Sequence, residues 1–301
     1  MDRHILGIDV GGTNVKLGIV APGGKIVARA NIATKNYSRS KLQLIKAMVR
    51  TADELIASEG LAKQDFCGVG IGLPGLIDPV GGIVRYLPNI PGWRNVRLQE
   101  IMENDLGLPV FIENDVNMIT LAEWKFGAGV GYQNFICITL GTGVGGGLIL
   151  NNAMYRGEGF VAGEVGHMPL GESTLEGHVG NGVLAERAGK IFKIRNMQPP
   201  DVFRLAQEGN ARAIEFWEEV GTYLGTTLAG VINLLNLRLV IVGGGVSNNY
   251  RFFAPAMKAT LKAKAMRVQA GMVKVTRCKL HNDAGIIGAR ILVEEFLIGK
   301  G

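Results

Sequence analysis

The sequence DVGGTN at residues 9–14 lies between two apolar runs that are rich in β-branched side chains. A second glycine-rich sequence, LGTGVGGG at residues 140–147, lies in the same way between two apolar runs. Each pattern predicts a β-hairpin with a tight turn. Glycine in such a turn lets backbone N–H groups face a bound anion. Two such turns, both with a threonine and one led by an acid, favour a duplicated fold that clasps a polyphosphate, with ATP as the first candidate.

The composition fits a globular protein of about two domains. The chain has 301 residues, of which 47% are hydrophobic and 19% charged, and the usual prior is ~150 residues per domain. The three cysteines, Cys67, Cys137 and Cys278, lie far apart in apolar runs, which indicates buried thiols in a reducing compartment. A strand that starts near His4 leaves no room for a signal peptide, and no uncharged apolar run approaches ~18 residues. We therefore expect a cytoplasmic protein without a membrane partner.

The net charge is +6, and part of the basic excess lies between Lys258 and Lys279. The simplest interpretation of this stretch is a solvated helix face and strand edge. A modest positive field would also steer anionic substrates. Aromatic residues are not interleaved with the basic ones, so a nucleic-acid groove is not expected.

The order of predicted elements repeats along the chain. The first half reads as a hairpin, a strand at 25–32, a helix at 40–59 closed by Gly60, a strand at 67–73, a helix at 96–105, a strand at 110–113 and a helix at 116–126. The second half reads as a hairpin at 135–150, a loop-rich stretch at 155–182, a helix at 210–235, a strand at 239–242, a helix at 251–264, a strand at 273–276 and a helix at 283–297. This order predicts an α/β protein of two duplicated domains, at 1–117 and 118–284, with helix 285–301 packed on the first domain. The ligand site is expected in the cleft between them.

The first turn carries an acid where a phosphate is expected. A carboxylate beside phosphate oxygens is repulsive unless a cation intervenes, and Mg²⁺ prefers one or two carboxylates, waters and substrate phosphates. We therefore predict that Asp9 binds Mg²⁺ through water; the alternative is an aspartate that only caps the turn. Thr13 offers a hydroxyl group to phosphate oxygens. Lys16 could point at the phosphates or at solvent.

The nucleotide is expected to contact both turns and a third glycine cluster. Thr142 and Gly143 would hold the other end of the triphosphate. The cluster at 243–245 follows a predicted strand and precedes a helix, so its bare backbone would let a base or ribose approach closely. The predicted nucleotide-binding residues are Asp9, Gly11, Gly12, Thr13, Asn14, Thr142, Gly143, Gly243, Gly244 and Gly245.

The sequence ENDVN at 113–117 lies between a predicted strand and a predicted helix. Phosphoryl transfer needs a carboxylate that accepts the proton of the acceptor hydroxyl. Asp115 is our candidate for this general base, and Asn114 would fix a neighbouring hydroxyl. The alternative is that both residues merely cap the helix.

Further candidates for a polyhydroxyl ligand follow in the second half. Glu164 and His167 lie in a glycine-flanked loop, and carboxylates and imidazoles hydrogen-bond vicinal diols well. Glu186, just inside a helix, could add a second carboxylate. Each of these residues taken alone is more often an ordinary surface residue.

Taken together, the motifs resemble those of the ROK family (repressors, open reading frames, kinases), within the actin/hexokinase-like ATPase superfamily. The resemblance covers nearly the whole chain. Its segments are DVGGTN from Asp9, GLPGLID from Gly72, PNIPGW from Pro88, ENDVN from Glu113, TLGTGVGGG from Thr139, AGEVGHM from Ala162, GGGV from Gly243 and NDAGIIGA from Asn282.

The resemblance implies an ATP-dependent sugar kinase that phosphorylates a hexose, usually at C6, with two ribonuclease H-like domains. It implies Asp115 as general base and usually a homodimer. The sugar contacts that it implies are Gly75, Asn89, Asn114, Asp115, Glu164, His167 and Glu186.

The chain departs from the family at its zinc site. The family pattern combines a histidine that matches His167 with three cysteines in a Cys-x-Cys-Gly-x-x-Gly-Cys-x-Glu run. Here Gly177, Val179 and Leu184 stand at the cysteine positions. A structural zinc site takes four ligands, and His167 and His178 alone do not supply them. We predict that the chain binds no zinc, and that Val179 and Leu184 turn inward so that packing holds the loop of His167.

The leading hypothesis is a kinase that phosphorylates glucose at O6. The sugar could instead be fructose, allose, mannose or an N-acetylhexosamine, and the donor could be polyphosphate or ADP in place of ATP. A sugar-responsive repressor would need a DNA-binding segment ahead of Asp9, where none is expected to fit. A non-catalytic sugar-binding protein is the remaining alternative, prompted by the missing cysteines.

Overall fold

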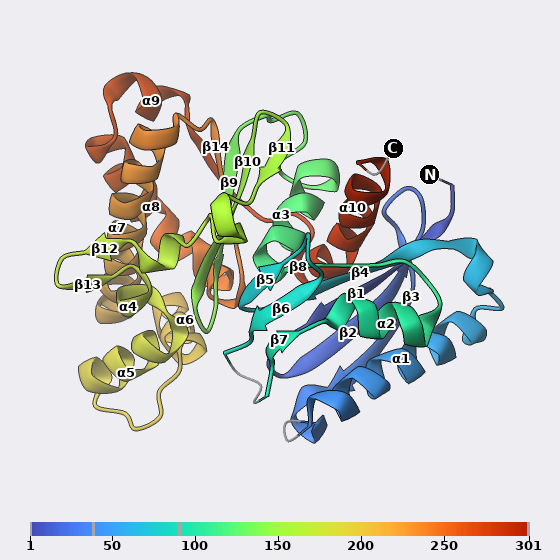
Figure 1. Cartoon of the computed structure of the whole chain (residues 1–301). Helices are drawn as coiled ribbons and strands as arrows, with labels where there is room; N and C mark the ends of the chain where they lie inside the picture. The colour runs from blue at the N-terminus through green and yellow to red at the C-terminus, as the bar shows by residue number, and fades with distance from the viewer. Residues whose placement is uncertain (1, 38–39, 89–91, 300–301) are drawn as a thin grey trace. The chain divides into compact units, whose positions relative to one another are not determined.

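The computed structural model describes residues 2–37, 40–88 and 92–299 (Figure 1). Its contacts divide the chain into two compact units. Unit 1 contains Met1–Val130, Arg156–Val161 and Leu280–Gly301, and unit 2 contains Gly131–Tyr155 and Ala162–Lys279. The predicted helix at 116–126 falls in unit 1. The predicted division of the chain at residue 117 remains a prediction.

Unit 1 is built on a five-stranded sheet of order β3-β2-β1-β4-β8. Strands β1, β2 and β3 pair antiparallel, and β4 and β8 continue the sheet in parallel from β1. The strands are β1 (His4–Val10), β2 (Asn14–Val20), β3 (Ile26–Ala33), β4 (Phe66–Leu73) and β8 (Val110–Asn114). A smaller sheet contains β5 (Leu76–Asp78), β6 (Ile83–Tyr86) and β7 (Arg94–Val96).

Helices cover both faces of the large sheet of unit 1 (Figure 1). The core on one face joins its strands to α1 (Lys41–Ser58) and α2 (Leu98–Leu106). On the other face lie α3 (Asp115–Phe126) and α10 (Ala284–Ile298). Helix α10 packs directly on the strand backbones, because a Cβ added at Gly7 would lie 2.5 Å from the Ile286 carbonyl oxygen. Helix α10 therefore lies directly against the sheet of unit 1.

Unit 2 repeats the strand plan of unit 1. Its sheet has the order β11-β10-β9-β14-β15, with β9, β10 and β11 antiparallel and β14 and β15 parallel to β9. The strands are β9 (Phe135–Leu140), β10 (Val144–Leu150), β11 (Ala153–Tyr155), β14 (Leu239–Gly243) and β15 (Lys274–Arg277). Strands β12 (Pro169–Leu170) and β13 (Ser173–Thr174) form a separate small hairpin. The predicted duplication is thus present in the sheet topology.

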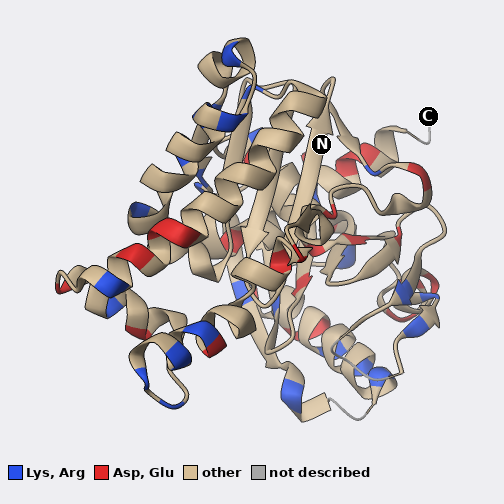
Figure 2. Cartoon of the chain, turned by 90° about the vertical axis from the view of Figure 1, so that its left-hand side faces the viewer, with Lys and Arg blue, Asp and Glu red and all other residues tan. Residues whose placement is uncertain are grey.

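The helices of unit 2 pack around α7, whose buried face includes Trp217, Leu224 and Leu228. They are α4 (Glu176–Val179), α5 (Asn181–Phe192), α6 (Pro199–Gln207), α7 (Ala211–Leu235), α8 (Tyr250–Lys264) and α9 (Arg267–Met272). Helices α8 and α9 carry basic residues and no acidic ones (Figure 2). Over the described ranges, no helix is long and apolar enough to span a membrane.

Most predicted elements lie within two residues of the observed ones, and the three cysteines are buried as predicted. Two predictions were incomplete. The helix expected at 96–105 begins only at Leu98, because residues 94–96 form β7. The stretch expected to be loop-rich at 155–182 contains short 3₁₀ turns, the β12–β13 hairpin and α4. Elements of two to four residues are too short to produce a clear hydrophobic period.

Candidate active site

The first glycine turn joins β1 to β2 at the end of Asp9's strand. The Gly11 amide donates to the Asn14 carbonyl oxygen at 2.9 Å, and the Thr34 hydroxyl donates to the Gly11 carbonyl oxygen at 2.9 Å. Gly12, Thr13 and Asn14 are exposed. A Cβ added at Gly12 would meet no atom within 4 Å. The hydrogen bonds of Gly11 therefore fix the turn, and the backbone from Gly12 to Asn14 stays accessible to a ligand.

Asp9 and Lys16 face each other across the β1–β2 hairpin. They are directly paired residues of the two strands, and Lys16 Nζ lies 3.6 Å from Asp9 Oδ2. The orientation of Lys16, which the sequence left open, is therefore toward the carboxylate. Burial raises the pKa of the Asp9 carboxyl above its ordinary value, although the neighbouring charge of Lys16 opposes this shift. A half-buried carboxylate with one nearby cation suits a second cation brought by a ligand.

The proposed base lies at the start of α3. Asn114 is the N-cap, and its Oδ1 accepts from the amides of Val116 at 2.9 Å and Asn117 at 3.2 Å. Its Nδ2 donates to the Gly75 carbonyl oxygen at 3.2 Å. Asp115 is half-buried, and its Oδ1 accepts from the Val116 amide at 2.9 Å. Asn114 thus does cap the helix, as the alternative interpretation stated, and it also positions the backbone around Asp115.

Strand register brings Asp9 and the Asn114–Asp115 turn to one edge of the sheet. Asp9 pairs with Gly72 of β4, and Gly72 pairs with Glu113 of β8. A Cβ added at Gly72 would lie 3.7 Å from the Asp115 Cα. Because the carboxyl ends of parallel strands meet at the same edge, this is where an α/β sheet commonly binds its ligand. Asn89 lies outside the described residues.

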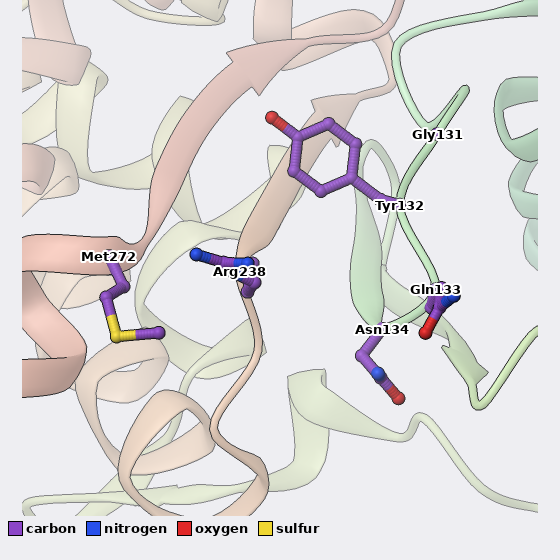
Figure 3. Close-up of a pocket in the computed structure, with 6 residues that line it drawn as sticks. All are labelled: Gly131, Tyr132, Gln133, Asn134, Arg238 and Met272. Atoms are coloured by element: carbon purple, nitrogen blue, oxygen red, sulfur yellow. The ribbon is translucent and has the colours of Figure 1, made fainter.

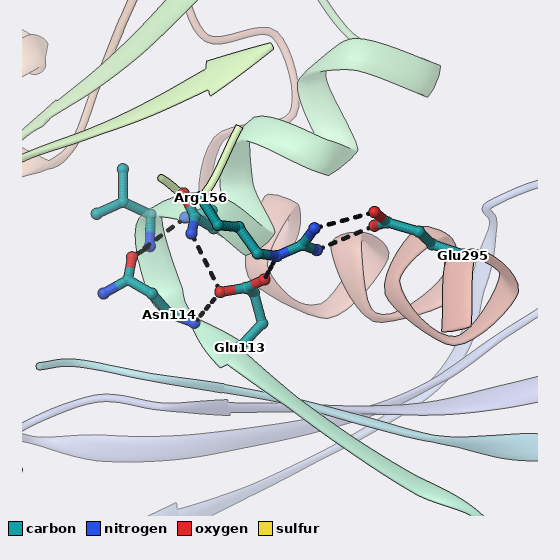
Figure 4. Close-up of polar contacts among 6 residues, drawn as sticks. Glu113, Asn114, Arg156 and Glu295 are labelled. Atoms are coloured by element: carbon teal, nitrogen blue, oxygen red, sulfur yellow. Dashed lines mark hydrogen bonds and ion pairs between the residues drawn. The ribbon is translucent and has the colours of Figure 1, made fainter. Parts of the chain in front are cut away.

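A buried ion-pair network behind this turn was missed in the sequence. Glu113, which is 2% exposed, accepts from Arg156 Nε at 2.6 Å. Arg156 also binds Glu295 of α10 through both terminal nitrogens, each at 3.0 Å (Figure 4). The three residues are far apart in sequence, so no local pattern links them. The only available signal was the placement of Glu113 at the end of an otherwise apolar strand.

Glu176 of α4 binds the second glycine turn, which lies between β9 and β10. Glu176 Oε2 accepts from the Val144 amide at 2.8 Å, and a Cβ added at Gly143 would lie 2.7 Å from the same oxygen. The Asn181 amide donates to the Gly141 carbonyl oxygen at 2.9 Å. A side chain at Gly143 would therefore have to displace the Glu176 carboxylate, and Thr142 lines a cavity.

This cavity of about 480 Å³ lies within unit 2. It joins the second turn to the third glycine cluster and to the start of α6. Apolar atoms come from Pro199, Pro200 and Phe203, and polar atoms from Thr142, Asn181, Gln198, Asn248 and Asn249. A pocket with an apolar wall and a few polar groups has the composition of a small-molecule site.

The glycines at 243–245 have different structural roles. Added Cβ atoms would lie 2.5 Å from Cys278 Sγ at Gly243 and 2.3 Å from the Leu140 carbonyl oxygen at Gly244. Gly244 also has φ of +82°, which disfavours other residues. Only Gly245 meets open space and lines the cavity. Internal packing therefore explains Gly243 and Gly244, whereas it does not explain Gly245.

The predicted sugar-contact residues of unit 2 are exposed. His167 Nε2 lies 3.8 Å from Glu164 Oε2, so the structure brings these two side chains together. Glu186 lies on α5, where its Oε1 accepts from Lys190 Nζ at 2.6 Å. That ion pair lowers the pKa of the Glu186 carboxyl.

A second cavity, of about 560 Å³, lies at the opposite ends of the strands of unit 2. Its lining comes from the residues just before β9, β14 and β15, namely Gly131, Tyr132, Gln133, Asn134, Arg238 and Met272 (Figure 3). The glycine turns lie after β9 and β14, so this cavity does not belong to the candidate nucleotide site.

Comparison with known proteins identifies the family. A model described as the ROK family matches residues 5–296. The chain belongs to the ROK family. A glucokinase of Halalkalibacterium halodurans is 31% identical over 98% of this chain and 96% of its own length. An N-acetylglucosamine repressor of Escherichia coli is 26% identical over 98% of this chain and 76% of its own length. The crystal structure of a ROK family glucokinase from Streptomyces griseus with glucose and AMPPNP aligns at a TM-score of 0.80 and 28% identity, covering 97% of this chain and 99% of that one.

In this ROK chain, Gly177, Val179 and Leu184 stand at the positions where the family pattern of the sequence analysis has cysteines. Val179 and Leu184 have no exposed surface, which confirms that they turn inward. The His178 ring stacks on Tyr223 with centroids 4.3 Å apart, and its Nε2 lies 3.0 Å from the Leu170 carbonyl oxygen. Apolar packing and one aromatic pair therefore order this loop.

No group of three or more His, Cys, Asp or Glu side chains that could hold a metal ion occurs in the described part of this ROK chain. The absence of zinc stays a prediction. Mg²⁺ requires less of the protein, since it usually keeps several waters and phosphate oxygens as ligands. The single carboxylate of Asp9 is enough to meet that requirement.

Proposed function

We propose that the chain is a hexose kinase that transfers the γ-phosphoryl group of MgATP to a sugar hydroxyl. The observation that carries this proposal is the placement of Asp9 and Asp115 at one edge of the unit 1 sheet, beside a glycine turn with accessible backbone. Phosphoryl transfer needs these parts: a carboxylate for the metal, a carboxylate for the hydroxyl proton and amides for the phosphates.

In this proposal both glycine turns are phosphate-binding elements. The adenosine would occupy the cavity of unit 2, with its base against Pro199 and Phe203 and its ribose near Gly245. The phosphates would lie on the turns at Thr142 and Gly11–Asn14, and Asp9 would hold Mg²⁺ through water. Bound Mg²⁺ would neutralise charge that develops on the transferred phosphoryl group. ATP is the donor that we propose, because polyphosphate has no base to fill the cavity of unit 2; ADP is the other alternative.

Asp115 acts as the general base in the proposed reaction. The sugar hydroxyl oxygen forms a bond to the γ-phosphorus as the bond from that phosphorus to the β,γ-bridging oxygen breaks. The hydroxyl proton passes to the Asp115 carboxylate, and ADP leaves with the bridging oxygen. Asn114 is already fixed by its cap and by Gly75, so its remaining capacity can orient the sugar.

We propose glucose as the sugar and O6 as the acceptor. The glucokinases of H. halodurans and S. griseus support this choice, since both are similar over nearly their whole length. Glu164, His167 and Glu186 would bind the other sugar hydroxyls. Fructose, allose, mannose and N-acetylhexosamines are the competing substrates.

A regulatory sugar-binding role is the second candidate, since the N-acetylglucosamine repressor of E. coli is also similar over nearly all of this chain. An assay of ADP release from MgATP against a panel of hexoses and N-acetylhexosamines separates the two. We expect turnover with glucose. No turnover with any sugar, together with sugar binding by calorimetry, would favour the regulatory role. The proposed homodimer is tested separately by light scattering.

A further inference from the structure

Glu113 is a buried acid two residues before the proposed base. Its Oε1 accepts from the Asn114 amide at 2.8 Å and from Asn117 Nδ2 at 3.1 Å, and its Oε2 accepts from Arg156 Nε at 2.6 Å. All these contacts use it as an acceptor, which is how an ionised carboxylate behaves. A buried carboxylate is costly to keep ionised unless it is paired and hydrogen-bonded. Arg156 supplies the opposite charge.

Arg156 is itself firmly held in unit 1. Its side chain is 14% exposed, and its guanidinium forms two hydrogen bonds with Glu295. It is also the first residue of Arg156–Val161, a segment of unit 1 whose chain neighbours on both sides belong to unit 2. A planar guanidinium with five donors can serve two carboxylates at once, which a lysine cannot reproduce with the same geometry. Figure 4 shows Arg156 between the two acids.

A series of contacts connects Arg156 with the Asn114–Asp115 turn, which carries the proposed base. Glu113 fixes the Asn114 backbone, Asn114 caps α3 and binds the Gly75 carbonyl oxygen, and Asp115 follows directly. Without Arg156, the buried Glu113 Oε2 would lose the hydrogen bond and the opposite charge that Arg156 supplies. A buried carboxylate left in that state is costly, so the Glu113 side chain would shift and the turn would lose a fixed point.

We propose that Arg156 is a positioning residue for phosphoryl transfer: by compensating the charge of Glu113, it holds the Asn114–Asp115 turn in the geometry that the sugar hydroxyl requires. This inference rests on the proposed function. A displacement of about 1 Å at a reacting group can lower a rate about 100-fold, so the effect should appear in kcat. The sugar and nucleotide contacts outside the turn would be kept, so both KM values should change little.

The test compares Arg156→Met, Arg156→Lys and the double variant Glu113→Gln/Arg156→Met in the full chain, with Asp115→Asn and wild type alongside. We expect Arg156→Met to lower kcat by about 10- to 100-fold and to change each KM by less than about threefold. Arg156→Lys should recover part of the loss because it keeps the charge. The double variant should recover about tenfold over Arg156→Met, because a neutral amide at position 113 needs no counter-charge.

Two controls separate positioning from general stability. Glu295→Gln leaves the Arg156–Glu113 pair in place, so it should lower Tm and leave kcat within about twofold. Arg29→Met removes an exposed ion pair with Asp283 in the same unit, and it should leave kcat unchanged. If Arg156→Met does not fold, Arg156→Lys and Glu295→Gln provide the comparison: equal kcat values for these two would contradict the proposal.

The proposal is overturned if Arg156→Met keeps kcat within twofold of wild type, or if the double variant is no more active than Arg156→Met. It is also overturned if the loss of kcat matches the loss of folded protein. A wild-type chain that turns over no sugar would overturn the proposed function and this inference together. An active wild type with an unaffected Arg156→Met would overturn this inference alone.

Discussion

Asp9 Oδ2 and Lys16 Nζ lie 3.6 Å apart on directly paired residues of the β1–β2 hairpin. The pair is too long for a strong hydrogen bond, and burial still raises the pKa of the Asp9 carboxyl. Without a ligand, Asp9 is therefore incompletely compensated. This state is expected of a carboxylate that gains a cation only when the ligand binds.

Asp9→Asn should stabilise the ligand-free protein at neutral pH and abolish its activity. The sign follows from linkage: an acid whose pKa is raised in the folded state binds protons more tightly there than in the unfolded chain, so stability falls as pH rises through that interval. At pH 3, below the ordinary carboxyl pKa of 3.8, Asp9 is mostly protonated in the folded and in the unfolded chain, so the difference in Tm between the two proteins should be smallest there. At pH 8, Asp9→Asn should have the higher Tm in the absence of Mg²⁺ and nucleotide. Equal Tm differences at the two pH values would contradict the burial argument.

Gly245→Val should weaken nucleotide binding alone. The added side chain would enter the cavity beside Thr142 and Phe203, and forcing atoms into an occupied site costs about 1–3 kcal/mol, so KM for MgATP should rise about tenfold or more. KM for the sugar should stay constant. Gly271→Val is the matched control, because a Cβ there also meets no atom within 4 Å but lies on α9, outside the cavity. Equal effects of the two variants would remove this cavity from the nucleotide site.

The His167 loop should not depend on zinc. Metal analysis of the purified protein should find far less than one zinc per chain, and dialysis against EDTA followed by excess Mg²⁺ should leave KM for the sugar unchanged. Stoichiometric zinc would contradict the prediction.

His178→Ala tests what orders that loop instead. It removes the stacking on Tyr223 and the contact with the Leu170 carbonyl oxygen. Losing about 1 kcal/mol of loop order would raise KM for the sugar about fivefold, while KM for MgATP stays near its wild-type value. An unchanged sugar KM would show that apolar packing by Val179 and Leu184 is sufficient.

The sequence predicted those features whose signals are local. The two glycine hairpins, the strand before Asp115 and the long helix α7 each have a clear period or a turn residue, and the repeated order of elements predicted the repeated sheet topology. The sequence placed Glu186 just inside a helix, which α5 bears out, but it gave that helix no bounds, and α6 was not predicted. Helix α5 contains two glycines, which weaken a helical pattern, and α6 has only nine residues.

The features that could not be predicted depend on tertiary contacts. Arg156 lies in the stretch that was expected to be loop-rich, and Glu295 lies in the last predicted helix. Only the fold brings Arg156 into contact with both Glu113 and Glu295. The separate roles of Gly243, Gly244 and Gly245 also required the positions of Cys278, Leu140 and the cavity. Close approach between distant segments leaves no periodic trace in a sequence.

The most direct test of the account is to measure turnover and binding together in Asp115→Asn. The introduced amide is nearly isosteric with the aspartate carboxylate but cannot accept the hydroxyl proton as a carboxylate does. The account predicts that kcat for phosphorylation of the sugar falls about 10²- to 10⁴-fold, while calorimetry gives wild-type affinities for the sugar and for the nucleotide. Turnover near the wild-type rate would show that Asp115 is not the base.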